Sequence, residues 1–412
     1  MKLRKLAAVL LTGVVMSAAL TGCGSGSSVS DNSSGGSESG RDKSSSQQTQ
    51  SQGDAQSSSA SDNSKGNDSM ENVKLLGRAY KADDGKLWMG LSGTGAELEF
   101  TGSKLSVTLK GNTSATDSAA RVGVFVDGQL TSDVCVDENE QTVDISGKDS
   151  EAVSVKIVKL SECASSCCAI TALDAHGGQI KKAADKQHKI EFIGDSITCG
   201  YGVDDADLTH GFSTATEDCT KSYAYKTAQA LDADYSLVSY SGYGIVSGYT
   251  PTGEKNAGEL VPPYYEYYGY CANGGFGSAD PSKTAWDFSA FTPDVIVIYL
   301  GTNDSSYAAG DEAKMQEYSQ KYTEFLKQVR AKNAGAKIIC TLGTMGTSMV
   351  EPMKAAVSDY SQQTGDSNIT TLELPVQDTA ADGMVVHGHP TAATYDKAAA
   401  LLTEKIKTEM GW

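Results

Sequence analysis

The sequence lacks the features that mark nucleic-acid-binding, zinc-binding and disulfide-rich proteins. It has 34 lysine and arginine residues against 52 aspartate and glutamate residues, so its formal net charge is −18. Such acidity argues against nucleic acid and anionic lipid head groups as partners, and it suits neutral substrates such as uncharged sugars. Nine cysteines in 412 residues are too few for a disulfide scaffold. No HExxH motif and no pair of CxxC motifs is present, so we expect no metal site.

Long apolar runs are also missing, except for a short one at residues 6–20 that follows three basic residues. A basic start, a short apolar run and small residues after it are typical of an export signal, and the run is too short for a comfortable membrane span. It ends in Leu-Thr-Gly-Cys, which resembles the lipobox of bacterial lipoproteins and implies cleavage before Cys23 with a lipid on that cysteine. We therefore expect a signal peptide at 1–22 and a lipid anchor on the extracellular face of the bacterial cell membrane. The alternative is an ordinary secreted protein with a chance cysteine.

Changes in composition divide the rest of the chain. Residues 23–72 are serine, glycine and other small or polar residues with almost nothing apolar. Such a segment cannot bury enough apolar surface to offset the entropy that it would lose on ordering, so we predict a disordered linker. In 73–186 apolar and polar residues alternate, as at 105–109 and at 122–126, and the Asp-Gly pair at 127–128 is typical of a hairpin turn. Several short strands without a convincing helix predict an all-β sandwich or jelly roll.

From residue 187 to 412, short apolar runs alternate with helical periods. The run at 295–298 is apolar without alternation, as expected for a parallel strand buried on both faces. This order predicts a doubly wound, flavodoxin-like α/β domain of three layers, with its site at the carboxyl ends of the strands. The predicted strands are 189–193, 235–240, 294–300, 337–342 and 369–374, and the predicted helices are 220–231, 311–332, 350–364 and 391–409. The tyrosine-rich segment 250–288 is predicted to be an ordered loop over the same end of the sheet.

Small polar motifs stand at three of the predicted strand ends and before the last helix. They are Gly-Asp-Ser at 194–196, Ser-Gly-Tyr-Gly at 241–244, Gly-Thr-Asn-Asp at 301–304 and His-Gly-His-Pro at 387–390. Parallel strands would bring them to one edge, where acyl transfer needs a hydroxyl nucleophile, a base in reach and fixed donors for the oxyanion. Taken singly, each residue has an ordinary role, such as a capping serine or a surface histidine. Their combination favours a catalytic site.

These four motifs, in this order, resemble the blocks of the SGNH (GDSL-type) hydrolases over roughly residues 189–410. The β-rich region before them, the run GDSITCGYG and residues 286–289 (Trp-Asp-Phe-Ser) look more narrowly like carbohydrate esterase family 2. That family joins a small jelly roll to an SGNH domain and removes acetyl groups from plant polysaccharides. The resemblance implies a serine hydrolase without metal or cofactor.

The resemblance also assigns roles to residues. It implies Ser196 as the nucleophile and His389 as general base and then general acid. The oxyanion hole would consist of the backbone N–H groups of Ser196 and Gly242 and the side-chain amide of Asn303. Gly244 is a near alternative to Gly242 as a donor.

One position departs from the family pattern. Most SGNH enzymes have an aspartate three residues before the histidine, and here that position is Val386. Some family 2 esterases work with a serine–histidine dyad and a backbone carbonyl that holds the imidazole. We therefore predict a dyad, with Asp382 as the less favoured third member.

The sequence thus favours a lipid-anchored extracellular esterase that removes O-acetyl groups from polysaccharides or oligosaccharides of the acetylxylan or glucomannan type. Its expected partners are an acetylated carbohydrate and, through Cys23, a membrane, but not nucleic acid. The tyrosines of the insert and Trp286 could stack on a sugar, or form the core of their own loop. Two other functions remain open: an SGNH esterase or lipase on peptidoglycan acetyl groups or lipid esters, and a glycan-binding lipoprotein without activity.

Overall fold

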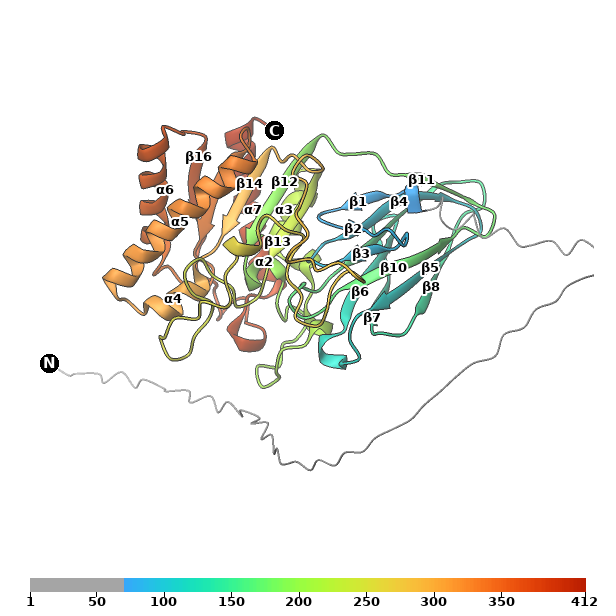
Figure 1. Ribbon diagram of the computed structural model, residues 1–412, viewed down its shortest axis with the longest axis horizontal. Coiled ribbons are helices and arrows are strands. Elements are labelled where there is room, and N and C mark those ends of the chain that lie inside the picture. Colours follow the sequence, from blue (N-terminus) through green and yellow to red (C-terminus); the bar gives the residue numbers. More distant parts are fainter. Residues whose placement is uncertain (1–69) are drawn as a thin grey trace, which may run out of the picture. The chain divides into compact units, whose positions relative to one another are not determined.

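The computed structural model describes residues 70–412 (Figure 1). The predicted signal peptide, Cys23 and the predicted linker as far as residue 69 lie outside the described residues. Among the helices of the described part, none is both long and apolar enough to cross a membrane.

Two antiparallel sheets form the first half of the described chain. Their strands are β1 (Lys74–Leu76), β2 (Tyr80–Lys81), β3 (Leu87–Met89), β4 (Gly95–Thr101), β5 (Lys104–Gly111), β6 (Ala120–Val126), β7 (Gln129–Val136), β8 (Gln141–Ser146), β9 (Val153–Lys159), β10 (Cys168–Asp174) and β11 (Gln179–Lys182). One sheet has the order β1-β4-β9-β6-β7 with β11 beside β4, and the other has the order β2-β3-β10-β5-β8. Alternate residues of β8 are buried, namely Val143 and Ile145, which pack with Leu98 and Phe100 in one core. The predicted β-sandwich is confirmed.

The second half is built on a five-stranded parallel sheet with the order β13-β12-β14-β15-β16. Its strands are β12 (His188–Gly194), β13 (Ala233–Ser239), β14 (Val295–Tyr299), β15 (Lys337–Leu342) and β16 (Ile369–Glu373). Every residue of β14 is buried, as its unbroken apolar run predicted. The order reverses between β12 and β14, so the carboxyl ends of these strands mark the place where such sheets hold their sites.

Helices cover this sheet as two packed pairs, α3 with α7 and α5 with α6 (Figure 1). The helices are α2 (Ser196–Cys199), α3 (Tyr223–Ala230), α4 (Thr302–Ala308), α5 (Glu312–Lys332), α6 (Val350–Thr364) and α7 (Ala392–Met410), with short 3-10 turns η1 (Thr116–Ser118), η2 (Thr214–Thr216), η3 (Cys219–Lys221), η4 (Pro262–Tyr264) and η5 (Val386–Gly388). Because the strand order reverses between β12 and β14 and crossovers between parallel strands are right-handed, the two helix pairs lie on opposite faces of the sheet. The doubly wound, three-layer fold is confirmed, and α5 begins one residue after the predicted start.

Buried polar contacts join the two halves. Arg78, which follows β1, is fully buried, and its guanidinium donates to the carbonyls of Tyr265 and Tyr267 at 2.5 and 2.8 Å. It also pairs with Glu191 of β12 at 3.2 Å and lies 5.3 Å from the ring of Trp286. Trp286 is only 8% exposed, so of the two alternatives left open for it the structure favours a core residue of its own loop.

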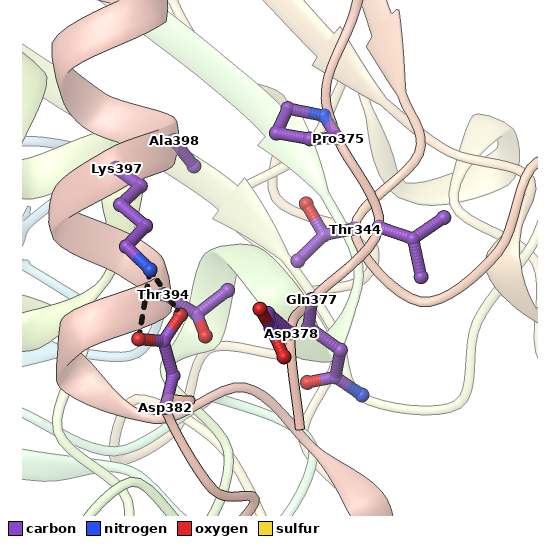
Figure 2. A pocket seen from close by; sticks show the side chains of 9 residues that line it. Thr344, Pro375, Gln377, Asp378, Asp382, Thr394, Lys397 and Ala398 are labelled. Atoms are coloured by element: carbon purple, nitrogen blue, oxygen red, sulfur yellow. Dashed lines mark hydrogen bonds and ion pairs between the residues drawn. The ribbon is translucent and has the colours of Figure 1, made fainter. Parts of the chain in front are cut away.

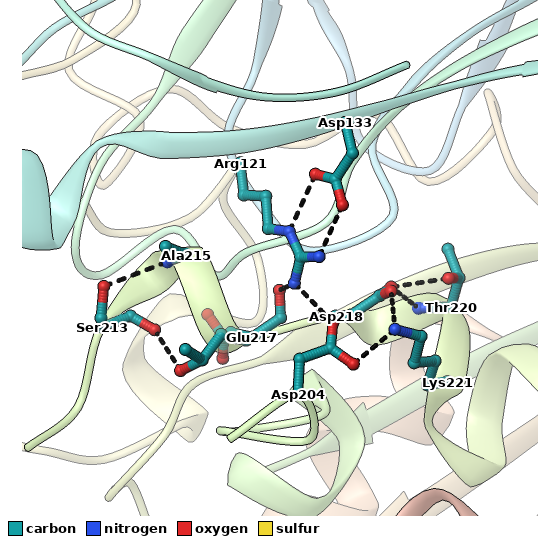
Figure 3. Close-up of polar contacts among 10 residues, drawn as sticks. Arg121, Asp133, Asp204, Ser213, Ala215, Glu217, Asp218, Thr220 and Lys221 are labelled. Atoms are coloured by element: carbon teal, nitrogen blue, oxygen red, sulfur yellow. Dashed lines mark hydrogen bonds and ion pairs between the residues drawn. The ribbon is translucent and has the colours of Figure 1, made fainter. Parts of the chain in front are cut away.

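A second junction surrounds Arg121 of β6 (Figure 3). Its guanidinium makes a two-bond pair with Asp133 of β7, at 2.9 and 2.6 Å. On the other side it donates to the Asp204 carboxylate at 2.8 Å and to the Glu217 carbonyl at 3.3 Å. These contacts tie the sandwich to the loop between α2 and α3, which borders the site described next.

Candidate active site

Ser196 lies at the point where the first parallel strand turns into a short helix. The preceding Asp195 caps α2, because its carboxylate accepts the Ile197 N–H at 3.0 Å. A side chain at Gly194 would meet the Thr198 hydroxyl oxygen at 2.0 Å, so the turn requires glycine there. Ser196 is 4% exposed and is the first residue of α2, where a helix has no internal acceptor for its N–H. Both its hydroxyl and its N–H are thus available at the sheet edge.

His389 meets Ser196 from a loop 193 residues further along the chain. Its Nε2 lies 2.9 Å from Ser196 Oγ, so the structure brings the two predicted residues together. Burial lowers the pKa of His389 to about 4, while the backbone carbonyls of Val386 and His387 act in the opposite direction. The imidazole is therefore neutral near pH 7, and Nε2 can accept the serine proton when Nδ1 carries the other proton.

The other ring nitrogen of this histidine has no side-chain partner among the described residues. Nδ1 of His389 is buried and forms no hydrogen bond with any described residue. Asp382 is engaged elsewhere: its carboxylate pairs with the Lys397 ammonium of α7, at 2.6 and 2.8 Å. Figure 2 shows this ion pair on the wall of a small cavity. The structure does not bring Asp382 and His389 together.

Two further donors lie around the loop after β13. Gly242 has a φ of +82° and its N–H has no acceptor among the described residues. The N–H of Gly244 donates to the Glu259 carbonyl at 3.1 Å, so of the two glycines only Gly242 has a free donor. Asn303 of α4 gives one amide hydrogen to the Tyr243 carbonyl at 2.8 Å, which leaves its second N–H for a ligand.

The loop that carries these donors is held by Asp304. Its Oδ1 accepts the backbone N–H groups of Ile245, Val246 and Ser247 at 3.1, 2.7 and 3.1 Å. Burial raises the pKa of Asp304 to about 6, although these three bonds oppose the shift. The Gly-Thr-Asn-Asp motif thus supplies a candidate oxyanion donor and the anchor of the neighbouring loop, from one helix that the sequence did not predict.

Glu162 is a site residue that the sequence did not reveal. It follows β9, and its Oε2 accepts the Ser241 N–H at 2.5 Å and lies 3.6 Å from the thiol of Cys199 in α2. One carboxylate from the β-sandwich therefore contacts both the helix of the nucleophile and the residue before Gly242. The only available signal in the sequence was a single acidic residue directly before three closely spaced cysteines, Cys163, Cys167 and Cys168.

The described residues that could hold a metal ion are Glu162, Cys199 and Glu217, whose ligand atoms all lie within 4.8 Å of one another. Glu217 is fully buried and accepts the Glu162 N–H at 2.8 Å. Burial raises the pKa of both carboxyl groups, and the charge of Glu162 raises the pKa of Glu217 further. A proton shared by this pair removes one of its two negative charges.

Known proteins match both halves of the chain. Residues 192–397 match the GDSL-like Lipase/Acylhydrolase family, and residues 75–193 match the family Carbohydrate esterase 2 N-terminal. The cellulase/esterase CelE of Acetivibrio thermocellus is 31% identical over 327 residues, which are 78% of this chain and 37% of CelE. An acetylxylan esterase / glucomannan deacetylase of Cellvibrio japonicus is 26% identical over 344 residues, which are 83% of this chain and 90% of that protein.

Solved structures agree with these matches. The family two carbohydrate esterase of Clostridium thermocellum, solved in complex with cellohexaose, is 30% identical and superposes with a TM-score of 0.73. The match covers 82% of this chain and 99% of that one. The chain spans about a third of the full length of CelE. The resemblance seen in the sequence is thus confirmed, and the chain belongs to the GDSL-like lipase/acylhydrolase family, among the family 2 carbohydrate esterases.

Proposed function

We propose that the protein is a serine esterase that removes O-acetyl groups from polysaccharides or oligosaccharides of the acetylxylan or glucomannan type. The observation that carries this proposal is the 2.9 Å approach of His389 Nε2 to Ser196 Oγ. The unpaired N–H groups beside it and the esterase activities of the relatives from Acetivibrio thermocellus and Cellvibrio japonicus support it.

The residues present account for each step of ester hydrolysis. Ser196 Oγ attacks the acetyl carbonyl while His389 Nε2 takes its proton, and the carbonyl oxygen becomes an oxyanion. The N–H groups of Ser196 and Gly242 and the Asn303 amide would stabilise that oxyanion. Protonated His389 then gives its proton to the departing sugar hydroxyl, which leaves acetyl-Ser196. Water, deprotonated by His389, hydrolyses this ester and restores the enzyme.

The test is acetate release from a panel of acetylated glycans. The panel contains acetylated xylan, acetylated glucomannan, O-acetylated peptidoglycan and a long-chain lipid ester. Wild-type protein should act on the plant polysaccharides, and Ser196→Ala and His389→Ala should each lower kcat by roughly 10³-fold or more. Mutants that match wild type contradict the assigned residues, and a wild type without activity on any ester favours a glycan-binding role.

We also propose that a lipid on Cys23 anchors the enzyme at the extracellular face of the membrane. The basic start, the short apolar run and the Leu-Thr-Gly-Cys sequence support this placement. Expression of wild type and Cys23→Ser in a bacterial host, followed by fractionation, tests it. Wild type should sediment with membranes and take up labelled fatty acid, whereas unlabelled wild type in the medium contradicts the anchor.

A further inference from the structure

His389 requires a substitute for the usual carboxylate. In a Ser-His-Asp triad the aspartate does two things: it orients the imidazole and it stabilises the imidazolium that forms when the serine is deprotonated. Nδ1 of His389 makes no hydrogen bond to a described carboxylate, and the nearby backbone carbonyls of Val386 and His387 raise the pKa of the imidazole without restoring it to its usual value. This leaves a role for a further group that fixes the ring and favours its charged form.

An aromatic ring lies directly against the imidazole. The ring of Tyr201 stacks on His389 with centroids 4.2 Å apart and planes 27° from parallel. On its other side Tyr201 stacks on Phe212, at 4.6 Å and 18°. Its hydroxyl lies 2.8 Å from Nδ1 of His387, two residues before His389. Tyr201 is thus fixed by a second ring and by one hydrogen bond to the histidine loop.

The backbone is shaped for this stack. Tyr201 lies between Gly200 and Gly202, which have φ values of +75° and +58°. A Cβ at Gly202 would come within 2.1 Å of the Val386 side chain, so glycine allows the two loops to touch. His387 itself has a φ of +56°, an unfavourable value for a non-glycine residue. The close approach of the loops explains why Gly-Tyr-Gly follows the nucleophile helix.

We propose that Tyr201 is the positioning residue of His389: its ring holds the imidazole in place and its π face stabilises the imidazolium, in the role of the missing aspartate. This inference rests on the proposed esterase function. A cation over an aromatic face is stabilised electrostatically, and most strongly where water is excluded. Donation from the Tyr201 hydroxyl to Nδ1 of His387 would make the Tyr201 ring more electron-rich. The expected contribution to kcat is roughly fivefold to thirtyfold.

The sharpest test replaces Tyr201 by phenylalanine and then by phenylalanines with one, two and three ring fluorines. Fluorine leaves the shape of the ring nearly unchanged but weakens the negative potential of its face. From Phe to trifluoro-Phe, kcat should fall stepwise by roughly fivefold to thirtyfold, with KM changed less than about twofold. Tyr201→Leu, which keeps an apolar side chain without a π face, should lose at least as much as the trifluoro variant.

A second readout does not depend on activity. Histidine-labelled protein has five histidines, and the His389 signal is assigned through His389→Asn. Its pKa, followed by NMR, should fall along the fluorine series, because the imidazolium loses stabilisation. The same series at Phe288, which lies 5.3 Å from the buried Arg78 guanidinium, is the control and should leave kcat unchanged.

The outcomes separate this inference from the proposed function. If kcat and the pKa of His389 both stay flat along the series, Tyr201 acts only by packing and the inference is wrong. If wild type shows no esterase activity, the proposed function fails, while the NMR series still decides whether the ring stabilises the imidazolium.

Discussion

At the scale of single residues, the site depends on the protonation of one histidine. Because burial lowers the pKa of His389 to about 4, the neutral base persists well below the usual histidine range. We therefore expect kcat/KM to stay high from pH 7 to about pH 5 and to fall as the pH drops through about 4. The measurement is a pH profile of kcat/KM with an acetylated oligosaccharide.

The same shift affects stability with a defined sign. Between about pH 6.5 and 4 the unfolded chain binds a proton on this imidazole and the native chain does not, so the native state loses stability as the pH falls.

The pH profile of kcat/KM needs a control, because burial also raises the pKa of Glu162. The profile should therefore be repeated with Glu162→Gln, in which that carboxyl group no longer titrates. If kcat/KM falls around pH 6.5 in both proteins, His389 is not held neutral.

Asp382 provides a second prediction for a single side chain. The Asp382 side chain is 10% exposed but its partner Lys397 is 58% exposed, so water screens the ion pair from one side and its contribution should stay within about 1 kcal/mol. We expect Asp382→Asn to keep kcat within about threefold of wild type and to change the unfolding free energy by less than about 1 kcal/mol. Steady-state kinetics and urea denaturation check this. Loss of activity in a folded Asp382→Asn protein would make the carboxylate a third catalytic member.

At the scale of elements, the loop after β9 reaches into the site. A hydrogen bond to a carboxylate is stronger than one to an amide by about 1 kcal/mol, so Glu162→Gln should loosen Ser241 and Gly242. We expect kcat to fall by roughly tenfold while KM changes less than about twofold. Steady-state kinetics on the same acetylated oligosaccharide measure kcat and KM separately.

A matched control exists in the same buried cluster. Glu217 contacts Glu162 but not the Ser241 N–H, so Glu217→Gln should keep kcat within about threefold. If both variants lose activity equally, the cluster supports the fold as a whole and Glu162 has no separate effect on the oxyanion loop.

The elements of the α/β half could be predicted from the sequence because their patterns are local. The unbroken apolar run of β14 and the helical period of α5 need no partner to be recognised. Helix α4 is seven residues long, too short to show a period, and its first residues were interpreted as a strand-end motif. The predicted strand ends did converge, because parallel pairing brings Ser196 and Asn303 to the same edge.

Residues that act through tertiary contacts could not be predicted in this way. Glu162 and Tyr201 have no partner nearby in sequence, since the first meets Ser241 and the second meets His389. The two alternatives for Trp286 stayed open for the same reason: its environment is set by Arg78, more than 200 residues earlier. A pattern of residue types does not reveal which distant groups will surround a side chain.

At the scale of the whole described molecule, the two halves share their most buried charges. Removal of Arg78 leaves the Glu191 carboxylate buried at 3% exposure without its cation. Breaking such a pair costs about 3–5 kcal/mol, so Arg78→Met should lower the unfolding free energy by that amount. Urea denaturation followed by fluorescence gives the value.

Lys104 offers the control for this prediction. It pairs with Asp144, and both side chains are about half exposed, so Lys104→Met should cost less than about 1 kcal/mol. Wild type should unfold in a single transition because the halves are joined through Arg78 and Arg121. Two separate transitions, or an Arg78→Met protein as stable as wild type, would mean that the halves fold independently.

The position of Glu162 also limits how such enzymes can be recombined. A β-rich module that merely bound glycan could be exchanged between fusion proteins without cost to the chemistry. Here the module delivers a carboxylate to the oxyanion loop of its neighbour. A chimera assembled from the sandwich of one relative and the hydrolase half of another should therefore be active only when the graft preserves that contact, so the two halves are inherited and engineered as one catalytic unit.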